Sequence, residues 1–409
     1  MGKSLTLSLE GLTVLIFYGF ILLNFISSDF RNVFFLILLL LAIINTNKLD
    51  FSVNKEELYL LSSYLFFFLI TLSFYFYHES PISDIDNYSR FLFVIPLYFL
   101  FKSTVINVDD FIKVIIITAL SIFILSSYLY FFNNPSLDRI AGLSSVSITY
   151  ANMIMTIVVY LLITMFEKLD RKRKILIIFA LACSILSWSL TMTKGSLIGL
   201  AFVLAYFFIS KSFNFNKVYA AISFMAVILV LSFTPIHHSI NSFYDDIKHI
   251  QKQELAEIHK DPNVSFSTKE RIFLLVNAKE MILEKPFTGV GYQNFQKRIM
   301  DETYKNNRRY GMAQHDHAHN DFIDLWAKIG IFGFLALVLF YIVNLRFFLK
   351  AVKHSSNNYF AKIGVATLLS QLGFMLTQTQ LSHHQPTLFF LVILIVVASQ
   401  TIKSIKPLS

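Results

Sequence analysis

The sequence predicts an all-α polytopic membrane protein with about twelve transmembrane helices and a large helical loop between the ninth and the tenth. The first observation is composition: 55% of the 409 residues are hydrophobic, 15% are charged, and the mean hydropathy is +0.60. A soluble globular chain carries more charge. The second is that apolar runs of roughly 17–25 residues, the length that crosses a bilayer, recur along the chain. Only residues 235–320 interrupt them with a long polar stretch.

The apolar runs give the predicted elements in order. Nine precede the polar stretch and three follow it, which divides the chain into three parts. These parts are an N-terminal transmembrane bundle (residues 1–234), a helical loop (residues 235–320) and the C-terminal transmembrane helices (residues 321–409). The predicted spans are residues 11–27, 32–46, 57–77, 88–101, 111–132, 145–166, 174–190, 194–210, 217–234, 321–348, 359–378 and 385–402.

Lysine and arginine residues in the short connections orient the chain, because cytoplasmic loops accumulate them. With the N-terminus inside, eighteen of them fall on the inner side and four on the outer side. This split predicts cytoplasmic N- and C-termini and an outward-facing loop. The net charge of +9 follows largely from the same bias and does not imply nucleic-acid binding. The single cysteine, Cys183, lies in an apolar span, so an intramolecular disulfide is excluded.

The polar stretch carries helix signals along most of its length. Residues 240–259 have the pattern of an amphipathic helix that ends at Asp261-Pro262-Asn263. The sequence Ser267-Thr-Lys-Glu270 resembles a capping box and predicts the start of a second helix, which ends at Pro286. A third, polar helix is predicted near residues 294–306. The loop is therefore expected to be a folded unit.

A histidine-rich segment stands where the loop meets the tenth apolar run. It reads His315-Asp-His317-Ala-His319-Asn320-Asp321. A neutral histidine is the side chain best suited to remove a proton near neutral pH. The spacing is not the HExxH pattern of zinc enzymes, and the nearby acids have no fixed ligand spacing, so no metal is predicted. The segment predicts acid–base chemistry at the membrane surface.

Four cations lie at the edges of apolar spans or helices on the outer side, where the topology rule disfavours them. They are Arg90, Arg139, Lys194 and Arg271. Each by itself is explained by snorkelling or by pairing with a nearby acid. Together they predict a binding site for an anion such as a diphosphate, which arginine grips bidentately.

Three segments together resemble the O-antigen ligase and O-antigen polymerase superfamily of bacterial envelope proteins. One is His319-Asn320 followed, after nine residues, by Gly330 and then Gly333. The others are Arg271 with the downstream segment Pro286-Phe-Thr-Gly-Val-Gly291, and Thr191-Met-Thr-Lys194-Gly195. The similarity is strong over residues 190–345 and weaker at Ser89-Arg90 and Asp138-Arg139.

The resemblance implies a metal-independent, inverting glycosyl transfer without a cofactor, at the periplasmic face of the bacterial inner membrane. The donor would be a glycan on undecaprenyl diphosphate, and the acceptor of a ligase would be a sugar hydroxyl of lipid A-core. His319 is then the candidate general base. Arg271 and Lys194 would bind the donor diphosphate, and Arg271 is also a candidate catalytic residue. The remaining candidates are Arg90 and Arg139 for the diphosphate, and His317 and Asn320 for orienting the acceptor or the base.

Two residues depart from the superfamily pattern. Lys194 stands where arginine is common, which replaces a planar fork by a point charge. Lys328 stands at a position that is often acidic in relatives. His383 and His384, between the last two spans, are expected either in the same cavity or at the membrane interface, and no role is assigned to His315.

Two other functions stay open. A polymerase of the same superfamily would join lipid-linked repeat units instead of attaching a finished chain. A polysaccharide transporter or flippase would need ionisable residues within the spans and helices interrupted near the middle of the membrane. The charged residues here gather at the outer boundary instead, which favours surface chemistry over a transport path.

Overall fold

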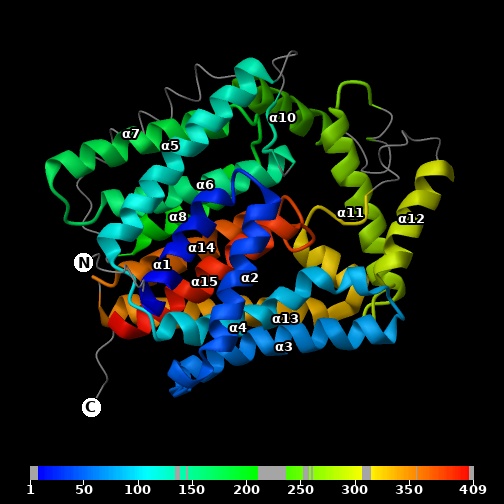
Figure 1. Ribbon diagram of the computed structural model, residues 1–409. Coiled ribbons are helices and arrows are strands. Elements are labelled where there is room, and N and C mark those ends of the chain that lie inside the picture. The colour runs from blue at the N-terminus through cyan, green and yellow to red at the C-terminus, as the bar shows by residue number, and fades with distance from the viewer. Residues whose placement is uncertain are drawn as a thin grey trace, which may run out of the picture.

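The computed structural model describes residues 8–133, 139–143, 146–210, 236–251, 258, 261–305, 315–355 and 357–404. Throughout these residues the chain is helical and forms no β-strand (Figure 1). The helices before the polar stretch are α1 (Leu9–Leu23), α2 (Ser28–Ile44), α3 (Lys55–Tyr77), α4 (Asp86–Lys102), α5 (Val108–Phe132), α6 (Ser147–Met165), α7 (Arg171–Ser189) and α8 (Ser196–Ile209). The later ones are α10 (Ile236–Ile250), α11 (Phe266–Glu284), α12 (Tyr292–Lys305), α13 (Asp321–His354), α14 (Tyr359–Met375) and α15 (His384–Ser404).

The helices α1–α8 and α13–α15 lie where eleven of the predicted spans were placed. The remaining span, residues 217–234, falls outside the described residues. Five of the described helices are long and apolar enough to cross a membrane: α3, α5, α6, α13 and α15. Two shorter helices, α1 and α8, are also apolar. The class is thus that of an all-helical protein with several apolar helices, and the count of twelve spans stays a prediction.

The centre of the bundle is formed by α6 and α15, whose apolar windows are both 94% buried. α4 and α14 pack directly against α15, and α14 also contacts α6 and α8. Hydrogen bonds join helices within this core: the Tyr160 and Thr367 hydroxyls lie 2.7 Å apart, and those of Thr164 and Tyr359 lie 2.8 Å apart. In a lipid environment such polar contacts and close packing hold helices together, because the bilayer is as apolar as the side chains.

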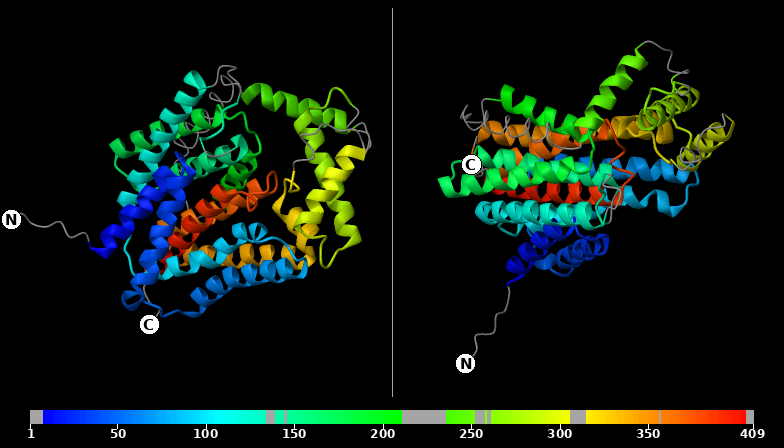
Figure 2. Two further views of the ribbon diagram at one scale, coloured as in Figure 1. Left: turned by 45° about the vertical axis from the view of Figure 1, so that its right-hand side comes forward. Right: turned by 90° about the horizontal axis from the view of Figure 1, so that it is seen from above.

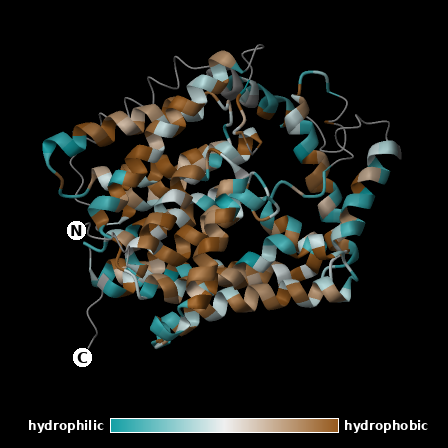
Figure 3. Ribbon diagram, in the orientation of Figure 1, coloured by the Kyte–Doolittle hydropathy of each residue, from teal (hydrophilic) through white to brown (hydrophobic). Residues whose placement is uncertain are grey.

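The loop helices α10, α11 and α12 form a separate layer beside one end of the bundle (Figures 1 and 2). The start of α1 and the end of α15 lie toward the opposite end (Figure 1). Colouring by hydropathy separates the largely apolar bundle from the more polar loop helices (Figure 3). The loop has its own small apolar core, in which Leu274, Met281, Phe295 and Ile299 are buried.

The loop helices differ in detail from the prediction. α10 ends at Ile250, earlier than the expected residue 259, and residues 252–257 and 259–260 lie outside the described residues. The expected capping box at Ser267 is wrong, because α11 already begins at Phe266 with Ser265 as its N-cap residue. The Ser265 hydroxyl donates to Asp246 of α10 instead, at 2.6 Å. A contact between two helices therefore replaces the local cap.

The segment between α11 and α12 is tied to the backbone of α13 at a kink. Gly330 has a φ of 73°, and a Cβ atom there would lie 2.0 Å from the Phe287 carbonyl oxygen. Across this contact the Ile331 N–H donates to the Pro286 carbonyl at 2.9 Å, and the Val290 N–H donates to Ala327 at 2.9 Å. Only glycine combines this backbone angle with so close an approach. The kink therefore fixes the loop helices relative to the helix that follows the histidine-rich segment.

Candidate active site

Four histidine rings lie together at the N-terminal end of α13. The ring centroids of His317 and His319 are 4.6 Å apart, and His315 lies 5.2 Å from His319. His383, from the connection between α14 and α15, lies 5.5 Å from His317. His317 and His319 are 6% and 8% exposed, so the cluster is largely withdrawn from solvent. Two chain segments that are far apart in sequence thus meet in one site.

Two carboxylates in the first turn of α13 hold these segments in place. Asp324 accepts a hydrogen bond at 2.8 Å from the Ala318 N–H, which lies between the two buried histidines. The same carboxylate pairs with Lys328 at 2.8 Å. Asp321 accepts from the Gln380 and Leu381 N–H groups at 2.7 and 3.0 Å, which anchors the connection that carries His383. Lys328, which departs from the superfamily pattern, is therefore paired with a buried carboxylate on its own helix.

Gln378 links the two halves of the cluster and defines which nitrogen of His319 is available. The Gln378 Oε1 contacts His319 Nδ1, and the Gln378 Nε2 lies 2.9 Å from His383 Nε2. With this amide orientation, His319 Nδ1 donates its proton to the glutamine oxygen. The opposite nitrogen, His319 Nε2, is buried without a hydrogen-bond partner among the described residues. In the neutral ring it carries a lone pair that is ready to accept a proton.

Burial favours the neutral form of three rings in the cluster: His317, His319 and His383. Desolvation is the largest cause that lowers the pKa of His319 to about 4, and the charge of Arg271 contributes in the same direction. The hydrogen bond that His319 donates to Gln378 opposes this shift. Burial also lowers the pKa of His317 and of His383 below the usual range. At neutral pH these three histidines are therefore bases and not cations.

The backbone at the motif is itself unusual. His319 has a φ of 54°, a left-handed conformation that non-glycine residues adopt at a cost of about 1–3 kcal/mol, often at functional sites. The next residue, Asn320, caps α13: its Oδ1 accepts from the Phe322 and Ile323 N–H groups at 3.0 and 3.2 Å. Its Nδ2 donates to the Leu376 carbonyl at 3.3 Å. The polar atoms of Asn320 are thus occupied in the structure by the helix start and by the neighbouring connection.

Three of the predicted cations share one side of the cluster. Arg271, in the first turns of α11, is close enough for its charge to act on both Lys194 and His319. Burial lowers the pKa of Arg271, and the neighbouring Arg139 adds to this effect while Glu270 opposes it. The Ile140 N–H donates to the Leu190 carbonyl at 3.1 Å, which places the Arg139 segment beside the turn that carries Lys194. Asp138 lies outside the described residues.

Arg90 belongs to a different group of side chains. It lies near the start of α4 and contacts Asp86, Asn87 and His384. The charge of Arg90 acts on Arg31 of α2 and on His384 of α15. Arg139, Lys194 and Arg271 instead neighbour one another, and Arg271 also neighbours His319. The four cations of the predicted anion site therefore fall into two groups with different neighbours.

A comparison with protein families supports a class of protein. Residues 177–338 match the family model described as O-antigen ligase. This match supports the O-antigen ligase and polymerase superfamily. Together with the apolar helices, it indicates a bacterial membrane protein of a glycosyltransferase-like family. A curated protein of Haemophilus influenzae, described as an uncharacterized protein, is 24% identical over 353 residues, which cover 84% of this chain and 86% of that protein.

The O-antigen ligase match contains the centre of the candidate site but not all of it. Lys194, Arg271 and His319 fall within residues 177–338. Gln378 and His383 fall outside this range, although they contact the cluster directly. Sequence reasoning overlooked Gln378, because a glutamine near the end of an apolar run carries no pattern of its own. Two acids, Asp321 and Asp324, follow the histidines at the start of a helix. Their position could have predicted that they anchor neighbouring segments.

The three histidines of the motif could also hold a metal ion, because one ring nitrogen of each lies within 4.8 Å of the others. His315 Nε2 is 2.6 Å from Glu270 Oε1, whereas His317 Nδ1 and His319 Nε2 have no hydrogen-bond partner among the described residues. Imidazole nitrogens suit zinc and other transition metals. The absence of a metal from the reaction stays a prediction, which metal removal tests.

Proposed function

We propose that this protein is an O-antigen ligase-type glycosyltransferase that moves a glycan from undecaprenyl diphosphate to a sugar hydroxyl of lipid A-core. The transfer takes place at the periplasmic face of the inner membrane, inverts the anomeric centre and uses no metal. The observation that carries the proposal is the Nε2 of His319, which has no hydrogen-bond partner among the described residues and lies in a neutral buried ring near the charge of Arg271. The family match gives the class of reaction.

The reaction is a single displacement. The acceptor hydroxyl oxygen forms a bond to the anomeric carbon while the bond from that carbon to the diphosphate oxygen breaks. His319 Nε2 takes the hydroxyl proton, and the undecaprenyl diphosphate leaves with the bonding electron pair. Attack from the side opposite the leaving group inverts the configuration. His317 and Asn320, on either side of His319, are the proposed orienting residues for acceptor and base, and Asn320 acts through the helix cap that it forms.

The cations next to His319 suit the leaving group. Negative charge grows on the departing diphosphate, and fixed positive groups in a site with little water stabilise it. Arg271 and Lys194 are the proposed ligands, with Arg139 as a third cation on the same side. The bound diphosphate also offsets the positive charge that lowers the pKa of His319. Donor binding is therefore expected to make His319 a stronger base.

The test is a deletion of this protein in its host, complemented with wild type, His319→Ala, Arg271→Ala or His354→Ala as a matched exposed-histidine control. The lipopolysaccharide and the undecaprenyl-linked pool are then examined together. Loss of long chains from lipid A-core with accumulation on the carrier, restored by wild type and His354→Ala only, is the expected result. A core with a single repeat would identify a polymerase. An unchanged pattern, or full activity of His319→Ala, would contradict the proposed reaction and the proposed base, respectively.

A further inference from the structure

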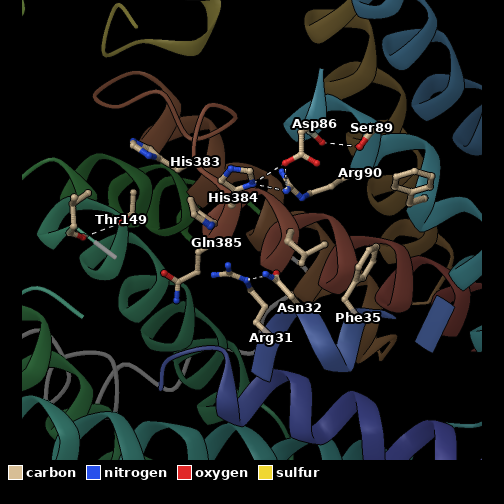
Figure 4. Close-up of a pocket in the computed structure, with 14 residues that line it drawn as sticks. Arg31, Asn32, Phe35, Asp86, Ser89, Arg90, Thr149, His383, His384 and Gln385 are labelled. Carbon is tan, nitrogen blue, oxygen red and sulfur yellow. Dashed lines mark hydrogen bonds and ion pairs between the residues drawn. The ribbon is translucent and has the colours of Figure 1, made fainter. Parts of the chain in front are cut away.

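A cavity of about 870 Å³ lies beside the histidine cluster, and neither Lys194 nor Arg271 is among the residues that line it. Figure 4 shows the residues around it, which come from α2, α4, α6 and the start of α15. His383 lines the cavity, and its ring also lies 5.5 Å from that of His317. A ligand in the cavity would therefore contact the same cluster that holds His319, through His383.

The cavity contains a buried cation that forms no ion pair among the described residues. Arg31 is 3% exposed, and its hydrogen bond is a single one, from Nε to Asn32 Oδ1 at 3.3 Å. Its Nη1 is buried without a hydrogen-bond partner among the described residues. The charge of Asp29 acts on Arg31, but among the described residues no carboxylate forms an ion pair with it. A buried charge without a partner is strongly unfavourable, so the site is built for an anion that is supplied from outside.

A second arginine and a histidine face the same space. Arg90 and His384 line the cavity together with Arg31, and the charges of the two arginines repel each other. Asp86 is the acid of this group, and it pairs with Arg90 at 3.0 Å and with His384 at 3.2 Å. Asp86 therefore pairs with Arg90 and His384 and not with Arg31. An arginine fork binds two oxygens of a phosphate group at once, which matches the unused Nη1.

Apolar side chains complete the wall of the cavity. Phe35 of α2, Phe93 of α4 and Leu388 of α15 lie around the charged groups. Phe93 is 42% exposed, and beyond Phe35 the surface of α2 continues with Leu36 and Leu40, which are 53% and 44% exposed. An acyl or prenyl chain would cover this apolar surface while its headgroup meets Arg31. The lining thus has a charged part and an apolar part, which match the headgroup and the chain of a lipid.

We propose that this cavity binds the phosphate-ester headgroup of a lipid, through Arg31 and Arg90, and that it is separate from the diphosphate site at Lys194 and Arg271. This inference rests on the proposed function, in which the lipid held here is the acceptor. Its phosphorylated sugar head occupies the cavity, and its hydroxyl reaches His319 past His383. Donor and acceptor then meet at the histidine cluster, the donor through Lys194 and Arg271 and the acceptor through Arg31. Arg90 is thereby reassigned from the donor to the acceptor.

The experiment measures binding to the purified full-length protein in detergent micelles, with three probes. The probes are lipid A, which carries phosphate monoesters, undecaprenyl diphosphate, and inorganic phosphate. The variants are Arg31→Gln, Arg31→Lys and, as the matched control, Arg271→Gln. Thermal unfolding of each variant verifies that it is folded; Arg31→Gln removes a buried charge and is expected to keep the fold.

We expect Arg31→Gln to weaken lipid A binding by about tenfold or more, the effect of losing a charge-assisted hydrogen bond. Arg31→Lys should recover part of it, and Arg271→Gln should leave it unchanged. Undecaprenyl diphosphate should show the reverse pattern. Unchanged lipid A affinity in Arg31→Gln would overturn the site, and a loss of undecaprenyl diphosphate affinity equal to that of Arg271→Gln would make the cavity a donor site. Inorganic phosphate binding as tightly as lipid A would remove the lipid from the proposal.

These readouts are independent of glycosyl transfer. A protein that binds lipid A through Arg31 but transfers no glycan would refute the proposed reaction and keep the cavity. A protein that transfers glycan normally with Arg31→Gln would refute the cavity and keep the reaction. The two proposals can therefore fail separately.

Discussion

Gln378→Glu is the substitution that tests the proposed state of His319 most directly. The glutamine Oε1 accepts the Nδ1 proton of His319, and burial lowers the pKa of that ring to about 4 from an ordinary 6.5. This difference corresponds to about 3 kcal/mol in favour of the neutral ring. A glutamate keeps the acceptor and adds a negative charge beside Nδ1. Because a hydrogen bond to a charged group contributes about 1.5–3 kcal/mol, we expect the pKa of His319 to rise by about one to two pH units.

The assay is the pH dependence of kcat/KM for glycan transfer, which reports the free enzyme. Transfer needs neutral His319, so the rate falls as the pH drops below the pKa of this residue. The acid limb should lie near pH 4 in the wild type and about one to two pH units higher in Gln378→Glu. Gln378→Leu removes the acceptor, and kcat should drop about tenfold or more without an upward shift of the limb.

Two outcomes would refute this reasoning. If the acid limb of Gln378→Glu coincides with that of the wild type, the carboxylate does not act on the catalytic base. If Gln378→Leu keeps full activity, the hydrogen bond to Nδ1 does not set the tautomer. Because Gln378 also contacts His383, the variant His383→Ala separates the loss of that second hydrogen bond from the effect on His319.

Three further predictions follow from the packing around the cluster. Asp324→Ala leaves Lys328 buried without its partner, so thermal unfolding should show that the free energy of unfolding falls by about 3–5 kcal/mol. Adding Lys328→Met should restore stability but not glycan transfer. Recovery of transfer in this double variant would show that the Asp324 carboxylate is not a positioning group. Gly330→Ala places a Cβ 2.0 Å from the Phe287 carbonyl oxygen, so the unfolding temperature should fall, and an unchanged value would contradict the tight docking of the loop. Treatment with EDTA should leave transfer intact, whereas a loss that zinc reverses would assign the motif histidines to a metal.

The histidine motif shows how far local sequence reaches into the site. His319, Arg271 and Lys194 were singled out because a polar cluster and isolated cations at the edges of apolar runs stand out against the composition around them. These features are local, so they can be read without the fold. The bundle helices were predictable for the same reason, since the length of an apolar run and the polar residues at its ends determine where a transmembrane helix begins and ends.

The tertiary structure alone decided how these residues are used. Gln378 and His383 reach the motif across about sixty residues of chain, and nothing in their own neighbourhoods marks them. The separation of Arg90 from Arg271 depends on which helices pack side by side, and long-range packing leaves no local pattern. The capping-box expectation at Ser267 was wrong because α11 already begins at Phe266, where Asp246 of another helix accepts a hydrogen bond from the Ser265 hydroxyl. The sequence by itself thus indicated the class of protein and the candidate residues, because composition, apolar runs and isolated polar groups are local features. Packing between distant helices decided which of these residues are neighbours and which nitrogen of His319 is left without a partner among the described residues.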